Sequence, residues 1–153
     1  MKHAPIRRNN YLQPLSREHH QGLLLCWKIR TGFRKTIDPL RIKAYTNWFY
    51  EKNLAKHFEI EEDFIFPLLG ADHPLVKKAI AEHRRLSRLF SEKNNIIKAL
   101  SFIEEDLEKH IRFEERILFH EVEQVASQKE LSLILEIHQE MVTVEDWGDE
   151  FWI

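Results

Sequence analysis

Apolar residues recur at intervals of three and four positions along almost the whole chain, which is the spacing that lines one face of an α-helix. Only four glycines and five prolines interrupt the 153 residues, and no stretch shows the alternation that is typical of a β-strand. The chain is therefore expected to fold as an all-α protein.

Cap and turn residues divide this pattern into four long helices and a shorter fifth one. Ser16 is the expected N-cap of the first helix, and Asp38-Pro39 has the residue types of an N-cap followed by the first helical position. Asp72 and Pro74 open the third helix in a similar way. The expected helices are at about 14–34, 38 to 67–70, 72–92, 96–126 and 129–144.

Connections this short favour antiparallel neighbours, so we expect an up-down-up-down four-helix bundle with a short extra C-terminal helix. A chain of this length is typically one domain. We expect it to cover residues 1–153, with the bundle core at about 15–126 and the C-terminal helix and an aromatic tail at 127–153. Trp147, Phe151 and Trp152 of the tail could cap the bundle or form the contact of a homodimer.

The composition argues against several classes of partner. A formal net charge of -2 gives no electrostatic reason to expect nucleic acid, and the single cysteine, Cys26, has no internal disulfide partner. The N-terminal segment lacks the apolar stretch of a secretory signal, and no run approaches the ~20 apolar residues of a membrane span. A cytoplasmic protein without nucleic-acid or membrane partners is expected.

One phrase occurs twice in the chain, as HFEIEEDFIFPLL from His57 and as HIRFEERILFHEV from His110. Each copy places a glutamate, Glu61 or Glu114, four residues after its histidine, so that both groups lie on the same face of a helix. Apolar residues lie on the same line, including Ile117 in the second copy, which predicts that this face is buried.

Nine histidines are unusual in such a chain, and four of them have a regular placement. Residues at equal distances from a turn lie at the same height in an antiparallel pair of helices. The midpoints of His20/His57, His57/His83 and His83/His110 are 38.5, 70 and 96.5, on or beside the three expected turns. One histidine per helix is therefore predicted at a single level of the bundle.

The first helix leaves two choices for this level. His19 and His20 are adjacent, and replacing one with the other moves the midpoint only from 38.5 to 38. Both have apolar residues one turn further along the helix. We slightly prefer His20 and keep both candidates.

Four imidazoles and two carboxylates in an apolar interior would be costly to bury unless they bind something. A pair of cations relieves the cost, because neutral imidazoles ligate metals and carboxylates can bridge between two of them. This donor set has no thiolate, so it suits iron or manganese better than a structural zinc site. The predicted ligands are His19 or His20, His57, Glu61, His83, His110 and Glu114.

Several other polar residues have less specific expectations. Glu59, Glu62, Glu82 and Glu115 are either surface residues or acceptors for the free N–H of a ligand histidine. His3, His73 and His138 are expected in loops or facing solvent. His120 lies about 15 Å of helix beyond His110 and is not expected to be a ligand.

The segments SREHHQGLLL, HFEIEEDFIFPLL, AEHRRL and HIRFEERILFHEV resemble the hemerythrin-like, or HHE cation-binding, domain family. The resemblance covers about residues 15–126 and implies a four-helix bundle around a non-haem di-iron centre with an oxo or hydroxo bridge. It makes His19 or His20, His57, His83 and His110 terminal ligands and Glu61 and Glu114 bridging ligands. Manganese or zinc are possible substitutes for iron.

One departure from the family affects the expected function. Oxygen-carrying hemerythrins have two ligand histidines four residues apart on the third helix, whereas Ala79 and Ser87 are the residues four away from His83. The set of four histidines and two glutamates looks more like the di-iron domains of sensing and nitrosative-stress or iron–sulfur repair proteins. The resemblance implies binding of, or reaction with, oxygen, nitric oxide or peroxide in sensing or stress protection. The alternatives are a di-iron oxidoreductase, an iron donor for cluster repair, or a metal-free interaction bundle.

Overall fold

The protein is described by a computed structural model that covers residues 8–139 and 147–153. The described residues form helices and connecting turns and contain no strand, which confirms the predicted all-α class. The α-helices are α1 (Gln13–Arg34), α2 (Pro39–Phe49), α3 (Ala55–Ile60), α4 (Pro74–Phe90), α5 (Ile96–Phe113), α6 (Phe119–Val125) and α7 (Gln128–Gln139).

Three π-helical turns interrupt two of the predicted helices without breaking them. Tyr50–Leu54 joins α2 to α3, Glu61–Ile65 follows α3, and Glu114–Leu118 joins α5 to α6. A short 3-10 turn, Phe66–Leu68, ends the α2–α3 segment. The second and fourth predicted helices are thus continuous rods in which individual turns hold one extra residue.

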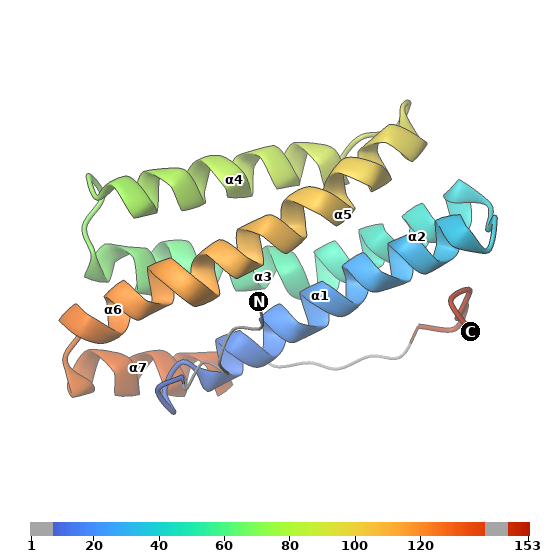
Figure 1. The fold of residues 1–153 in the computed structure, drawn as a ribbon. Coiled ribbons are helices and arrows are strands. Elements are labelled where there is room, and N and C mark those ends of the chain that lie inside the picture. The colour runs from blue at the N-terminus through green and yellow to red at the C-terminus, as the bar shows by residue number, and fades with distance from the viewer. Residues whose placement is uncertain (1–7, 140–146) are drawn as a thin grey trace, which may run out of the picture.

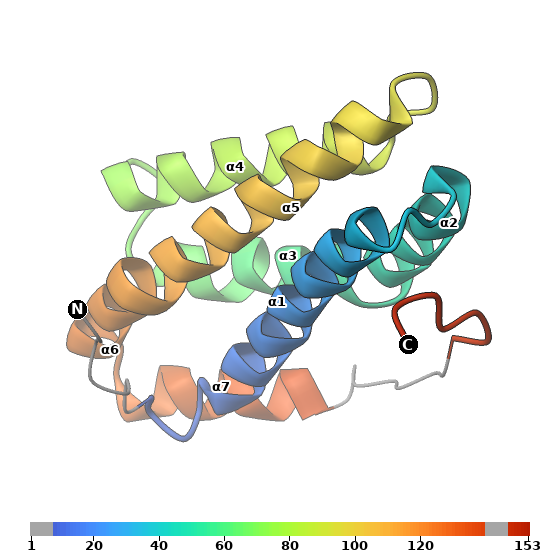
Figure 2. The ribbon, with the colours of Figure 1, turned by 45° about the vertical axis from the view of Figure 1, so that its right-hand side comes forward.

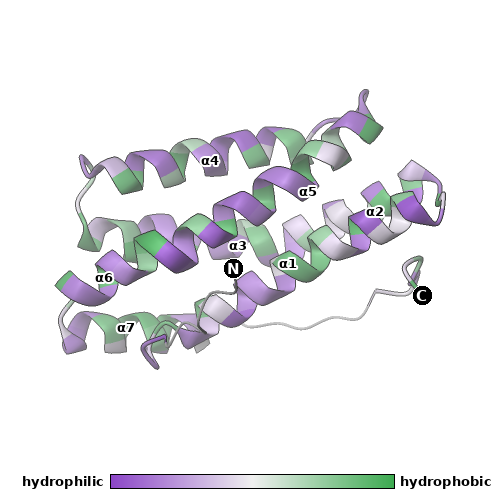
Figure 3. Cartoon of the chain, viewed as in Figure 1, coloured by the Kyte–Doolittle hydropathy of each residue, from purple (hydrophilic) through white to green (hydrophobic). Residues whose placement is uncertain are grey.

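Figure 1 shows α1, the α2–α3 segment, α4 and the α5–α6 segment lying lengthwise against one another. The same arrangement is visible from the rotated view of Figure 2, where α7 lies beside the N-terminal end of α1. The closest helix neighbours are α1 with α5 and α4 with α5. Figure 3 shows hydrophobic and hydrophilic residues mixed along every helix, as amphipathic helices require.

The helix starts follow local capping chemistry. The Asp38 side chain accepts a hydrogen bond from the Leu40 backbone N–H at 2.9 Å, as predicted for an N-cap. The first helix begins at Gln13, earlier than predicted, with Pro14 in its first turn. Ser16 is therefore not its N-cap. At the third helix His73, and not Asp72, is the cap, because its ring Nδ1 accepts from the Leu75 N–H at 3.1 Å.

Buried apolar residues form two separate clusters, one towards each end of the helices. On α1, Leu15 belongs to one cluster and Leu25 to the other, while on α4 the same division separates Val76 from Leu86. The residues between these pairs include His19 and His83. A polar layer therefore lies between two apolar ones.

Residues of the C-terminal part pack into both apolar clusters. Leu131 and Ile134 of α7 pack into one apolar cluster, and Phe151 of the tail packs into the other. The predicted fifth helix is confirmed as far as Gln139, and its expected continuation to 144 lies outside the described residues. Among the described helices, none is long and apolar enough to cross a membrane.

Candidate metal centre

Six ionisable side chains from four helical segments meet in the polar layer. Each of them is at most 3% exposed. Their donor atoms form two groups, and within each group these atoms lie within 4.8 Å of one another. The first group is His19, His57, Glu61 and Glu114, and the second is His83, His110, Glu61 and Glu114.

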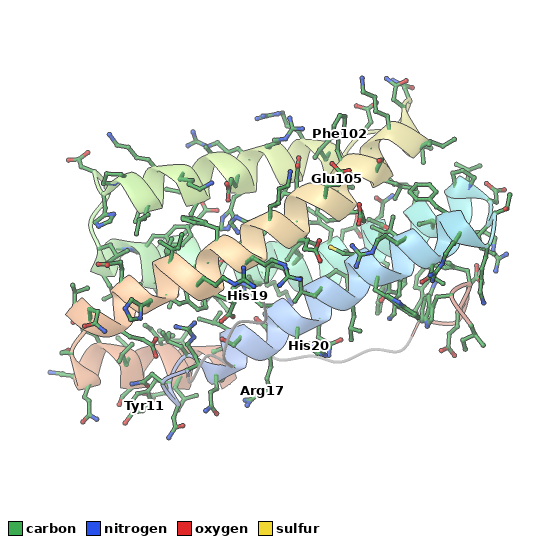
Figure 4. All side chains as sticks on the ribbon, in the orientation of Figure 1. Tyr11, Arg17, His19, His20, Phe102 and Glu105 are labelled. Atoms are coloured by element: carbon green, nitrogen blue, oxygen red, sulfur yellow. The ribbon has the colours of Figure 1, made fainter. Side chains whose placement is uncertain are left out.

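The structure separates the two histidine candidates on α1. His19 is 3% exposed, and its Nε2 lies 2.9 Å from an oxygen of Glu114. His20 is exposed, and Figure 4 shows it on the other side of α1 from His19. The slight preference for His20 is thus corrected to His19, because neighbouring residues on a helix point about 100° apart and only one of them faces α5.

The two glutamates shared by both groups are each the first residue of a π-helical turn. Glu61 begins Glu61–Ile65, and Glu114 begins Glu114–Leu118. A π-turn holds an extra residue, so the side chains within the turn and after it are rotated away from the positions that an α-helix would give them. Ile117, predicted on the buried line of His110, is 49% exposed, whereas Leu118 is buried. The prediction that Ile117 lies on the buried face is therefore wrong.

The tips of the six side chains face a common space. One oxygen of Glu61 lies 3.3 Å from Nε2 of His57, and the other lies 3.1 Å from Nε2 of His83. The two oxygens of Glu61 therefore face two different histidines of the two groups. Nε2 of His110 lies 3.2 Å from an oxygen of Glu114.

Most of these atoms lack a hydrogen-bond partner within the described part of the chain, even though they are close together. The buried atoms without one include both oxygens of Glu61, one oxygen of Glu114 and the Nε2 atoms of His57, His83 and His110. Buried polar atoms without a partner cost free energy, and a bound ligand that pairs with them would remove this cost. Imidazole nitrogens and carboxylate oxygens aimed at one space are metal ligands by chemical type.

Four further carboxylates contact the four buried histidines at the ring nitrogen that points away from the centre. The Nδ1 atom of each histidine lies 2.6–2.8 Å from a carboxylate oxygen. The pairs are His19 with Glu115, His57 with Glu18, His83 with Glu62 and His110 with Glu82. Such partners fix the tautomer and leave Nε2 free to bind a metal.

The sequence had suggested three of these four acceptors. Glu62, Glu82 and Glu115 act as partners of the histidines, whereas Glu59 is exposed. Glu18 was missed. The sequence contained a signal for Glu18, because Glu18-His19 and Glu82-His83 are the same dipeptide on the first and third helices. Each of these glutamates contacts the ligand histidine of the following helix, His57 for Glu18 and His110 for Glu82.

His138 is a further correction. It was expected to face solvent, yet it is 2% exposed on α7. Its Nε2 lies 2.9 Å from Glu18, at ion-pair distance although not at a hydrogen-bonding angle. The sequence could not indicate this contact, because it depends on where α7 docks. His120 is exposed, as expected for a residue that is not a ligand.

Apolar rings enclose the ligand histidines. Phe58 stacks on His83 with ring centroids 3.8 Å apart, and Phe119 stacks on His19 at 5.1 Å. Phe66 and Phe119, which occupy equivalent positions nine residues after His57 and His110, both contact a histidine of another helix. These contacts restrict the rotation of the imidazoles and keep water away.

The charges of the cluster are strongly coupled. Burial alone lowers the pKa of His57, but Glu61 and Glu18 outweigh it and raise that pKa to about 9. Burial likewise raises the pKa of Glu114, but His110, His19 and His83 outweigh it and hold that pKa well below its ordinary value. Without a metal, protons on the histidines therefore balance the carboxylates, and metal binding has to displace them.

No family model matches the chain, and no curated protein or solved structure matches it either. The assignment of this site therefore rests on its own geometry. Two buried groups of histidine and glutamate, sharing Glu61 and Glu114, could each hold a metal ion.

Proposed function

We propose that the protein is a hemerythrin-like metal-binding protein whose centre holds two iron ions and binds or reacts with oxygen, nitric oxide or peroxide in sensing or stress protection. The observation that carries the proposal is the convergence of six buried donor residues in two groups that share both glutamates. The proposal includes an up-down-up-down arrangement of the four helical segments, which places one ligand histidine on each.

The donor set supports iron for chemical reasons. Each metal position offers two imidazoles and the oxygens of two shared carboxylates, with no thiolate in either group. Four protein donors would leave positions free on a six-coordinate ion, and such a mixed nitrogen and oxygen set suits iron or manganese. When bound, an iron pair supplies reversible electron exchange with a small oxidant.

The chain's own residues prepare the site for that chemistry. The carboxylates behind the histidines orient the imidazoles, and the phenylalanine rings exclude water from the centre. Glu61 and Glu114 supply two negative charges between the two positions. Exclusion of water favours a small ligand over a bulky organic substrate.

Metal analysis tests the proposal directly. The purified protein, or protein incubated anaerobically with ferrous salt, is expected to contain about two metal ions per chain. Alanine at His19, Glu61 or His110 should lower the affinity by at least about tenfold, because even residues behind metal ligands typically contribute 10–100-fold. His20→Ala and His120→Ala are matched controls, since both side chains are exposed histidines on the same segments. Less than one metal ion per chain after anaerobic loading would contradict the proposal.

The type of activity needs a second measurement on the loaded protein. A stoichiometric and reversible change in the ultraviolet–visible spectrum with oxygen or nitric oxide would support a sensor or binding protein. Sustained consumption of the oxidant in the presence of a reductant would support a di-iron oxidoreductase instead. Transfer of iron to an apo iron–sulfur protein would support the role of an iron donor.

A further inference from the structure

The two candidate metal positions have matching inner ligands but different surroundings. We call His19 and His57 the first position and His83 and His110 the second, with Glu61 and Glu114 shared between them. Each histidine is held through Nδ1 by one outer carboxylate. The difference lies in what holds those outer carboxylates.

At the first position, Glu115 is held by several donors. The Ser16 hydroxyl donates to it at 3.1 Å, and Arg8 lies 3.2 Å from the same oxygen. The Arg8 side chain is only 5% exposed and also donates to Glu123 at 2.5 Å and to the Glu115 backbone carbonyl. Glu115 is therefore held both by Ser16 of α1 and by Arg8, which precedes that helix.

The second carboxylate of the first position is covered by α7. Glu18 lies between Nδ1 of His57, at 2.8 Å, and Nε2 of His138, at 2.9 Å. His138 is 2% exposed. Behind each histidine of the first position, the outer carboxylate contacts a buried side chain, Arg8 for His19 and His138 for His57.

At the second position the difference lies in the partners of the outer carboxylates and not in the carboxylates alone, since Glu82 is 28% exposed and Glu18 is 35% exposed. The Glu62 side chain, which holds His83, is 41% exposed, and His83 is its only hydrogen-bond or ion-pair partner within the described ranges. Glu82, which holds His110, pairs with Lys78, and the Lys78 side chain is 52% exposed. Exposed pairs of this kind restrain a side chain only weakly.

From this asymmetry we infer that Arg8 and His138 are positioning residues that make the first metal position the slowly exchanging one, so that metal enters and leaves through the His83–His110 position. The inference rests on the proposed di-metal function. A ligand histidine that turns away releases its ion, and it turns more easily when its Nδ1 partner is mobile. The buried hydrogen bonds of Arg8 and the close contact of the buried His138 restrain the outer carboxylates more than an exposed partner does.

The test follows the release of iron from the protein loaded anaerobically with two ferrous ions per chain. Mixing with an excess of a chromogenic ferrous chelator should give two phases of equal amplitude. Arg8→Gln and His138→Gln should each accelerate the slow phase by roughly tenfold, in the range found for residues behind metal ligands, and leave the fast phase unchanged. Glu62→Gln and Lys78→Ala are the matched changes at the second position and should alter the fast phase alone.

A spectroscopic measurement assigns the phases to positions. Protein loaded with iron-57 should show two Mössbauer doublets, and a short chelation should remove one of them. Arg8→Gln should shift the doublet that survives chelation, and Arg8→Lys, which keeps the charge, should restore the native signal in part. A merely structural loss would lower the melting temperature without this selective shift. If Arg8→Gln does not fold, His138→Gln carries the same test.

The possible outcomes are distinct. A single release phase, or acceleration of the fast phase by Arg8→Gln and His138→Gln, would overturn the inference even if two irons bind. Failure to bind iron at all would instead overturn the proposed function.

Discussion

His19 and His20 show how much depends on the rotation of a single helix. The two residues are chemically identical and adjacent, but only His19 contacts the Glu114 carboxylate and is buried. Both lie over apolar residues one turn further along, so the apolar pattern of α1 does not separate them. The packing of α1 against α5 does.

The coupled charges of individual residues predict a pH dependence for the metal-free protein. The pKa of His57 is about 9 in the fold, above its ordinary 6.5, so its contribution to stability is fully present below pH 6.5 and is lost as the pH rises through 9. The pKa of Glu18 is about 2, because His138 and His57 outweigh the effect of burial. Its contribution is present above pH 4.5 and is lost as the pH falls through 2.

The free energy of unfolding of the metal-free protein should therefore decrease between pH 6.5 and 9, with His57 alone contributing on the order of 3 kcal/mol. Metal-loaded protein should not lose stability in this window, because its histidines carry no proton to lose. Urea denaturation at pH 6.5 and at pH 9 measures the free energy of unfolding of the metal-free and of the metal-loaded protein. Equal stability of the metal-free protein at pH 6.5 and 9 would contradict the charge assignment.

At the scale of elements, the π-helical turns decide how the shared glutamates are presented. Glu61 and Glu114 each start such a turn, and Phe64 and Ile117, which lie within the two turns, are exposed. The extra residue in the turn brings Phe119, five positions after Glu114, to the side of the rod that faces the centre, where its ring stacks on His19. In a regular α-helix, a residue five positions further along would point about 140° away from Glu114.

Deleting Arg116, an exposed residue of the second π-turn, should convert that turn into an α-turn. The residues after it would rotate by about 100°, which would remove Phe119 from its stack on His19. We expect weaker metal binding and a lower melting temperature with little change in helical circular dichroism. Arg116→Ala keeps the extra residue and is the control. Equal metal affinity of the deletion and the control would rule out a role for the π-turn.

On the scale of the whole molecule, the polar layer lies between two apolar clusters that are closed by different parts of the C-terminal region. The aromatic tail packs against α2, where Phe151 is 3% exposed and its ring lies 5.9 Å from that of Tyr45. Arg41 and Asp149 add an ion pair at 2.7 Å. Of the two roles considered for the tail, the capping of the bundle is the one that these contacts support.

The tail can be tested apart from the metal centre. Phe151→Ala should lower stability by about 3–5 kcal/mol, which corresponds to roughly 10 °C in melting temperature for a chain of this size. Metal content should not change, because the aromatic contacts of Phe151 are with Tyr45 and Trp152, which are not ligands or partners of ligands in the centre. Ile153→Ala, at a position that is 80% exposed, should have almost no effect. A change in metal stoichiometry with Phe151→Ala would show that the tail and the centre are coupled.

Local chemistry was enough to predict much of this protein. Helical periodicity, the Asp38 cap and the break before Ile96 follow from neighbours in the chain. The repeated spacing of His57 with Glu61 and of His110 with Glu114 is a property of a single helix. His83 is as many residues from the two neighbouring turns as His57 and His110 are, which predicts the same level in the bundle. These features depend only on residues a few positions apart and on short connections.

Tertiary structure decided what depends on the rotation and docking of the helices. The choice of His19, the outward turn of Ile117 and the contacts of Glu18 with His57 and His138 arise between segments that are distant in the chain. A period of three to four residues marks the buried face of a helix but does not fix its angle, and π-turns shift that angle within one rod. The amino-acid pattern therefore determined which residue types meet at one level, and packing determined which individual side chains face the centre.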